Sequence, residues 1–139
     1  MKNPPIVDKE KPGLVRKLSA WLPLIVWAAV LFGLSSIPGQ EIPTFDVSFS
    51  DKIAHCGVYG VWGILSFRAL RLTTRLRLGY AILLTALMAL AYGVSDEIHQ
   101  MFVPQRSPDP LDVMADVFGG TLGALAGSLW PGWARRAPR

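Results

Sequence analysis

Four long apolar stretches divide the chain and constrain its fold more than any other feature. Residues 19–37 carry no charge, and further apolar stretches follow at about 53–67, 78–101 and 111–130. A helix needs about 20 mostly apolar residues to cross a bilayer. With 51% hydrophobic and only 17% charged residues among 139, the chain is more apolar than one water-soluble core requires. We therefore predict an all-α, polytopic membrane protein built as a four-transmembrane-helix bundle.

The first apolar stretch follows a basic segment, so a cleaved signal peptide is the alternative interpretation. Its uncharged run of 19 residues exceeds the apolar core of a signal peptide, which spans about 7–15 residues. We interpret it as the first membrane span. The predicted organisation is a basic tail at 1–17, a transmembrane domain at 18–133 and a second basic tail at 134–139.

The charges alternate between the two ends of the predicted spans. The tails and the loop between the second and third spans hold 12 of the 14 basic residues, namely Lys2, Lys9, Lys11, Arg16, Lys17, Arg68, Arg71, Arg75, Arg77, Arg135, Arg136 and Arg139. The other ends hold 8 of the 10 acidic residues, namely Glu41, Asp46, Asp51, Asp96, Glu97, Asp109, Asp112 and Asp116. Because basic residues favour the cytoplasmic side, both termini are predicted to be cytoplasmic in a bacterial plasma membrane. This asymmetry accounts for the net charge of +4 without a nucleic-acid partner.

Small residues indicate how the spans pack. Gly119, Gly123 and Gly127 form a ridge at four-residue spacing in the fourth span, and the second span contains Gly57, Gly60 and Gly63. Such ridges allow helices to approach closely, either within one chain or between chains, so the oligomeric state stays open. We interpret the five tryptophans, which are Trp21, Trp27, Trp62, Trp130 and Trp133, mostly as anchors at the membrane interface.

Ionisable residues gather at the predicted outer ends of three spans. The second span opens with Asp51, Lys52, His55 and Tyr59, and the third closes with Tyr92, Asp96, Glu97, His99 and Gln100. Arg106 lies in the next loop, and Asp112 and Asp116 begin the fourth span. Ionisable groups at membrane depth usually face the interior of a bundle, where they pair. We therefore expect these side chains to converge.

The charges of this group do not balance. Five carboxylates face two fixed cations, so carboxylates are protonated, histidines are charged, or a cation binds. Carboxylates beside histidines also suit general acid–base chemistry. His55 and His99 with carboxylates would suit zinc or manganese, but no metal-binding motif such as H-E-x-x-H is present, so no metal is predicted and the cofactor stays unassigned. The alternative is that Asp51 caps a helix and that Asp112 and Asp116 form a hydrated helix start. We interpret Asp46 and Asp109 as solvated loop charges.

Two segments resemble the VanZ-like family. They are DKIAHCGVYG at 51–60 and AYGVSDEIHQMFVPQRSPDPLDVMADVFGGTLGALAG at 91–127. The family pattern is D-K-x-x-H-x-x-x-Y, then D-E-x-x-Q, F-x-P-x-R and D-x-x-x-N or D before a glycine-rich helix. Here Asp116 stands in place of the asparagine, and Gln105 stands where the family often has glycine. The resemblance implies a small helical membrane protein, whose founding member is associated with resistance to the glycopeptide antibiotic teicoplanin. It points to Asp51, Lys52, His55, Tyr59, Asp96, Glu97, Gln100, Arg106, Asp112 and Asp116.

Two main hypotheses of function follow. In the first, an enzyme or binding site in the outer leaflet acts on a membrane lipid or lipid-linked cell-envelope precursor. Arg106 and Lys52 hold its phosphate, Asp51 orients His55, and Glu97 with His55 or His99 transfers protons. The remaining contacts to the substrate come from Tyr59, Asp96, Gln100, Asp112 and Asp116.

In the second hypothesis, the polar cluster is a structural lock, and the protein modulates a partner or the envelope without catalysis. It rests on the expectation that four short helices leave no large pocket. A proton-coupled channel or transporter is a weaker third reading, because the ionisable residues gather at one face and do not cross the membrane.

Overall fold

The computed structural model describes residues 12–41 and 50–134, and every regular element within them is helical. The main helices are α1 (Leu14–Ser35), α2 (Ser50–Thr73), α3 (Leu78–Gln100) and α4 (Pro110–Ser128). Two short elements, η1 (Gly39–Glu41) and α5 (Pro131–Ala134), were not predicted. The all-α prediction is confirmed. Asp46 and most of the predicted tails, including Lys2, Lys9, Lys11, Arg135, Arg136 and Arg139, lie outside the described residues.

Among the described residues, three helices are long and apolar enough to cross a membrane: α1, α2 from Asp51, and α3. The fourth, α4, is 19 residues long, contains two aspartates and four glycines, and is not among these three. Large apolar side chains point outward from the bundle, such as Ile25 (61% exposed) and Phe118 (61% exposed). Such an apolar outer surface is typical of helices that face lipid.

Glycines bring α2 and α4 into backbone contact. A methyl group on Gly119 would overlap the backbone of Cys56, and one on Gly123 would overlap the carbonyl of Gly60. The predicted close packing of the two spans is therefore confirmed within one chain. Gly57 has no neighbour within 4 Å of such a methyl group and takes no part.

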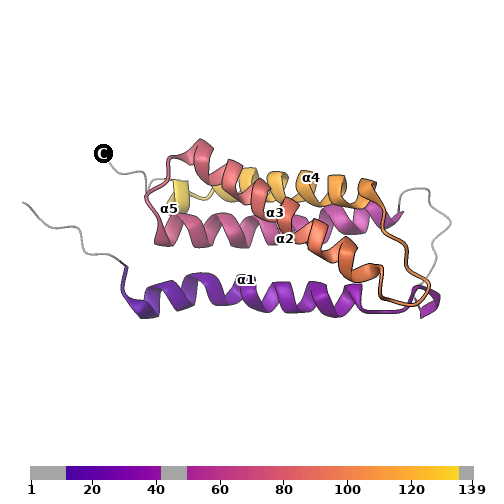
Figure 1. Cartoon of the computed structure of the whole chain (residues 1–139). Coiled ribbons are helices and arrows are strands. Elements are labelled where there is room, and N and C mark those ends of the chain that lie inside the picture. Colours follow the sequence, from indigo (N-terminus) through magenta and orange to yellow (C-terminus); the bar gives the residue numbers. More distant parts are fainter. Residues whose placement is uncertain (1–11, 42–49, 135–139) are drawn as a thin grey trace, which may run out of the picture.

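Aromatic side chains join α1 to the other helices, which it flanks on one side (Figure 1). Trp62 is 6% exposed and stacks on Tyr92 with 4.5 Å between ring centroids. The indole of Trp27 donates a hydrogen bond of 2.9 Å to the carbonyl of Val58. The interpretation of the tryptophans as interface anchors is therefore wrong for Trp62, which belongs to the core. Trp130 is 61% exposed, as an anchor would be.

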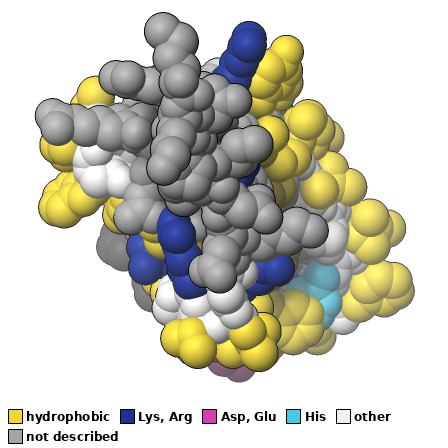
Figure 2. All heavy atoms as spheres, turned by 90° about the vertical axis from the view of Figure 1, so that its left-hand side faces the viewer, with side chains coloured by type: hydrophobic (Ala, Val, Ile, Leu, Met, Phe, Trp, Pro, Cys, Tyr) yellow, Lys and Arg dark blue, Asp and Glu magenta, His cyan; other side chains and the backbone are white. Residues whose placement is uncertain are grey.

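The bundle has two chemically different ends. At one end, which we call the acidic end, α2 begins, α3 ends and α4 begins; at the other, the basic end, α2 ends and α3 begins. Lys and Arg side chains gather on the basic end, seen in Figure 2. Arg68 and Arg71 lie in the last turns of α2 and not in the predicted loop. Arg71 is 2% exposed and donates hydrogen bonds to the carbonyls of Leu76 (2.6 Å) and Trp133 (2.9 Å).

Candidate functional site

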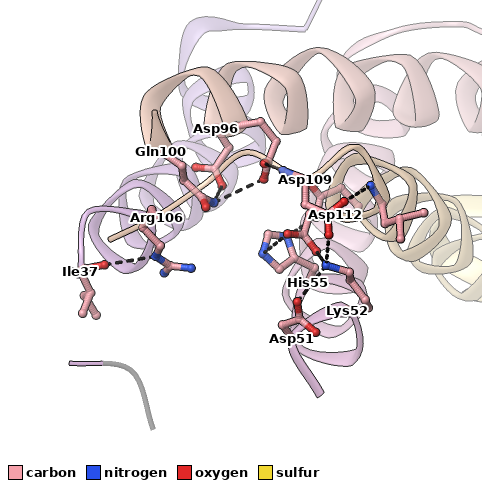
Figure 3. Close-up of polar contacts among 12 residues, drawn as sticks. Ile37, Asp51, Lys52, His55, Asp96, Gln100, Arg106, Asp109 and Asp112 are labelled. Atoms are coloured by element: carbon pink, nitrogen blue, oxygen red, sulfur yellow. Dashed lines mark hydrogen bonds and ion pairs between the residues drawn. The ribbon is translucent and has the colours of Figure 1, made fainter. Parts of the chain in front are cut away.

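At the acidic end, Lys52 links two helices and the segment between α3 and α4. Its ammonium lies 2.8 Å from Asp51, 2.7 Å from Asp112 and 2.5 Å from Asp109 (Figure 3). Only 18% of the Lys52 side chain is exposed. The expected convergence of α2 and α4 at their polar ends is present, and an ion network holds it.

Asp109 belongs to this network and is not the solvated loop charge expected from the sequence. Its carboxylate caps α4 by accepting a 2.9 Å hydrogen bond from the N–H of Leu111, and its own N–H donates a 2.7 Å bond to Glu97. The hydrogen bond from Lys52, followed by the one from Leu111, lowers the pKa of the Asp109 carboxyl. The signal that could have found this residue is Asp followed by Pro110, a typical helix start.

His55 is oriented by Asp116 from the neighbouring helix. Its Nδ1 lies 2.9 Å from Asp116 Oδ1, and its Nε2 lies 4.0 Å from Asp112 Oδ2. Asp116 is fully buried. The prediction that Asp51 orients His55 is wrong, because Asp51 is exposed and pairs with Lys52. The glycine contacts between α2 and α4 bring Asp116 to the histidine instead.

The end of α3 contributes three buried polar side chains. The amide of Gln100 donates hydrogen bonds to Asp96 Oδ2 (3.1 Å) and to Glu97 Oε1 (3.4 Å). These residues are between 3% and 8% exposed. Gln100 thus holds two neighbouring carboxylates in fixed positions.

A pocket of about 350 Å³ opens beside this cluster. Its apolar wall includes Leu31, Leu34, Ala54 and Val58, and its polar lining consists of Ser35, Glu41, Asp51, His55, Tyr59, Asp96, Gln100 and Arg106. The expectation that four short helices leave no large pocket is wrong. Residues from α1, α2 and α3 at this end line one cavity.

Two pocket residues have hydrogen-bonding capacity to spare. Arg106 donates from Nε to the carbonyl of Ile37 (3.3 Å), and it makes no ion pair with any described residue. Figure 3 shows its guanidinium well apart from the Lys52 network. The hydroxyl of Tyr59, which is 1% exposed, has no hydrogen-bond partner within the described ranges. Both groups are therefore available to a ligand.

His99 stands apart from the other predicted site residues. Its Nε2 forms a 3.0 Å hydrogen bond with Ser36 Oγ, and its ring packs 4.5 Å from the ring of Phe32. It does not line the pocket. The structure thus brings most predicted residues to one end, where Asp51 belongs to both the Lys52 network and the pocket lining, and it leaves His99 outside the pocket.

Gln105, which stands where the VanZ-like pattern often has glycine, has an unusual backbone conformation. It adopts φ of 58°, in the left-handed region, and is the one described non-glycine residue with positive φ. Glycine adopts this conformation without steric cost. The turn therefore favours the glycine that the family often has at this position, and Gln105 adopts the same backbone conformation at some steric cost.

A family model described as VanZ/LLP1 matches residues 18–131 of the chain. No curated protein and no solved structure matches it.

Proposed function

Because the chain belongs to the VanZ/LLP1 family, we propose that it is a four-span protein of the bacterial plasma membrane with both termini in the cytoplasm. Three apolar helices support the membrane location. The fourth span would be α4, whose two aspartates are buried within the bundle and so do not face lipid. The arginines at the basic end favour a cytoplasmic location for that end. The acidic end then faces outward.

The proposed function is to bind an anionic lipid or lipid-linked cell-envelope precursor in the pocket at the acidic end. The observation that carries it is the combination of an apolar wall with an Arg106 guanidinium that no described carboxylate neutralises. A guanidinium binds phosphate through two parallel hydrogen bonds. The apolar wall would hold the start of a lipid chain. A role in teicoplanin resistance would follow from sequestering or altering such a precursor.

The same site has the parts for proton transfer. His55 lines the pocket, and buried Asp116 holds its ring from behind, as a carboxylate does for a catalytic histidine. Glu97 is a second buried carboxylate nearby. If the bound lipid is processed, these are the groups that would move the proton.

The test is equilibrium binding of a radiolabelled polyprenyl phosphate and of phosphatidylglycerol to the purified full chain, with phosphatidylcholine as the zwitterionic comparison. Arg106→Gln should reduce binding of both anionic lipids by about tenfold or more, which corresponds to one charge-assisted hydrogen-bond pair. Arg77→Gln removes the same charge from an exposed position at the basic end and should bind like wild type. Equal binding by wild type and Arg106→Gln contradicts the proposal.

Turnover is tested separately by following the labelled polyprenyl phosphate over time. Glu97→Gln and His55→Ala should abolish any conversion while lipid binding persists. Expression in a teicoplanin-sensitive strain then tests the link to resistance. Unchanged conversion in both variants ends the catalytic part of the proposal.

The alternative function is a structural lock, and the Lys52 network favours it. One ammonium contacts three carboxylates from α2, α4 and the segment before α4. Under this alternative, Lys52→Met and Arg106→Gln would both lower the unfolding temperature in detergent. Under the binding proposal, only Lys52→Met does so, because Arg106 makes a single hydrogen bond to a backbone carbonyl.

A further inference from the structure

His55, Glu97 and Asp112 place three potential metal-ligand atoms close together at the acidic end. One atom from each residue lies within 4.8 Å of the other two. Each residue comes from a different helix: α2, α3 and α4 respectively. Neither the proposed lipid binding nor the family assignment accounts for this arrangement.

The separation of the ligand atoms suits a shared cation. Nitrogen and oxygen ligands lie about 2.0–2.2 Å from zinc, so two ligands of one ion are separated by about 3–4 Å. His55 Nε2 and Asp112 Oδ2 are 4.0 Å apart. That distance is too long for a hydrogen bond, and an inward movement of about 0.5 Å would bring the two atoms to the separation of two ligands of one tetrahedral ion.

Each of the three residues is also oriented by a contact behind it. Asp116 accepts from His55 Nδ1 at 2.9 Å, which leaves the lone pair of the neutral ring on Nε2. Glu97 accepts from the N–H of Asp109 at 2.7 Å. Lys52 contacts Asp112 through Oδ1, so Oδ2 is left facing His55. Outer contacts of this kind hold metal ligands in place in known sites.

The charge around the three residues calls for a cation. Asp116 is fully buried, and its Oδ2 has no hydrogen-bond partner in the part of the chain that the structure describes. Glu97 and Asp112 are 6% and 7% exposed. Among residues 12–41 and 50–134, Lys52 is the one Lys or Arg side chain in ionic contact with this group, and it is shared with Asp51 and Asp109. Burying several carboxylates against a single ammonium is costly unless more positive charge is present.

We propose that His55, Glu97 and Asp112 form a binding site for a divalent transition-metal cation, Zn²⁺ or Mn²⁺. One imidazole and two carboxylates are ligands that both ions accept. Three protein ligands leave a coordination position open, which water or a ligand phosphate oxygen can fill. The site stands independently of lipid binding, because none of its three ligands requires the pocket to be occupied.

The experiment is titration of the purified full chain in zwitterionic detergent with Zn²⁺ or Mn²⁺ alone, after chelator treatment and dialysis and without added lipid. We expect one ion per chain, measured by calorimetry and by elemental analysis. His55→Ala and Asp112→Asn should weaken binding by about 100-fold or more. Asp116→Asn, which removes only the orienting carboxylate, should weaken it by about 10- to 100-fold.

His99→Ala is the matched control. It removes the only other histidine of the chain, which bonds to Ser36 away from the three ligands, and it should bind the ion like wild type. If a ligand variant does not fold, two further measurements on wild type and His99→Ala take its place. In both, Co²⁺ should give visible absorption bands typical of nitrogen and oxygen ligands, and Zn²⁺ should raise the unfolding temperature.

Two results would overturn the assignment. One is the absence of saturable Zn²⁺ or Mn²⁺ binding to wild type up to millimolar concentration. The other is equal affinity of wild type and His55→Ala. Because no lipid is present, neither result bears on lipid binding in the pocket, which has its own test above.

Discussion

The two ends of the bundle bury charge in opposite ways. At the basic end, the buried Arg71 donates to the carbonyls of Leu76 and Trp133, which ties the end of α2 to the following loop and to α5. Arg68 similarly reaches the carbonyls of Ser19 and Ala20 in α1, at 3.3 Å each. The Ser19 carbonyl needs such a donor, because its usual helical partner at position 23 is a proline without an N–H.

At the acidic end, buried charges contact one another beside a cavity. Carboxylates outnumber cations there, and Arg106 and Tyr59 keep hydrogen-bonding capacity free toward the pocket. Burial of charge alone therefore does not identify a functional site. What distinguishes the acidic end is incomplete satisfaction of polar groups around a space large enough for a ligand.

The largest expected effect concerns the basic end. Arg71→Ala should destabilise the protein by about 3 kcal/mol, because it leaves buried carbonyls without donors and opens a void. Unfolding in detergent followed by circular dichroism measures this loss. Arg77→Ala, at an exposed position on the same end, should stay within about 0.5 kcal/mol of wild type. Equal losses in the two variants would mean that the buried Arg71 guanidinium does not stabilise this end.

The next largest effect is expected at the glycine contacts between α2 and α4. Gly123→Ala places a methyl group against the backbone of Gly60 and should cost about 2 kcal/mol through forced separation of α2 and α4. Gly57 is a glycine of α2 with no atom within 4 Å of an added methyl group. Gly57→Ala should therefore leave stability unchanged or raise it by up to about 1 kcal/mol. The same unfolding assay applies. A neutral Gly123→Ala would mean that the helices are not in backbone contact.

A smaller effect is expected at the turn that precedes α4. Gln105→Gly should stabilise the protein by about 1 kcal/mol, because φ of 58° costs a side-chain-bearing residue more than glycine. Gln105→Ala retains a Cβ and should show no gain. Lower stability of the glycine variant would indicate that the Gln105 side chain has a role of its own.

The smallest effect is a pH dependence of stability at Asp109. Its pKa is lowered in the folded protein by the hydrogen bond to Lys52. A group with a lowered folded pKa stabilises above its unfolded pKa of about 3.9 and loses that contribution as pH falls through the folded value. Asp109→Asn retains a capping side chain but not the ion pair. Wild type should therefore exceed the variant in stability at pH 7, and the difference should shrink toward about pH 3; a constant difference would contradict this assignment.

The sequence was sufficient for the positions of the main helices and for most of the residues that meet at the acidic end. Apolar length predicted α1, α3 and α4 to within a few residues, and the glycine ridge predicted the contact of α4 with a neighbour. Pairings across helices could not be predicted. Spacing along α2 suggested Asp51 as the partner of His55, whereas the partner is Asp116, because the rotation of α4 against α2 decides which carboxylate faces the ring.

Two other features also depended on three-dimensional placement. The pocket is lined by residues from α1, α2 and α3 that lie far apart in the sequence, and no local pattern encodes how these helices are placed relative to one another. His99 follows Glu97 by two residues, and this spacing turns it to another face of α3, toward Ser36 and Phe32. Asp109 was predictable from its position before Pro110, but its contact with Lys52 was not.

The central claim is that the acidic end is a ligand site for an anionic lipid. Native mass spectrometry of the full chain, released from detergent after purification from membranes, tests it most directly. Wild type and Arg77→Gln should retain anionic phospholipid or polyprenyl phosphate at a stoichiometry near one, and Arg106→Gln should lose it while keeping its unfolding temperature. Equal retention by all three proteins, or loss of lipid only together with loss of folding, would contradict the account.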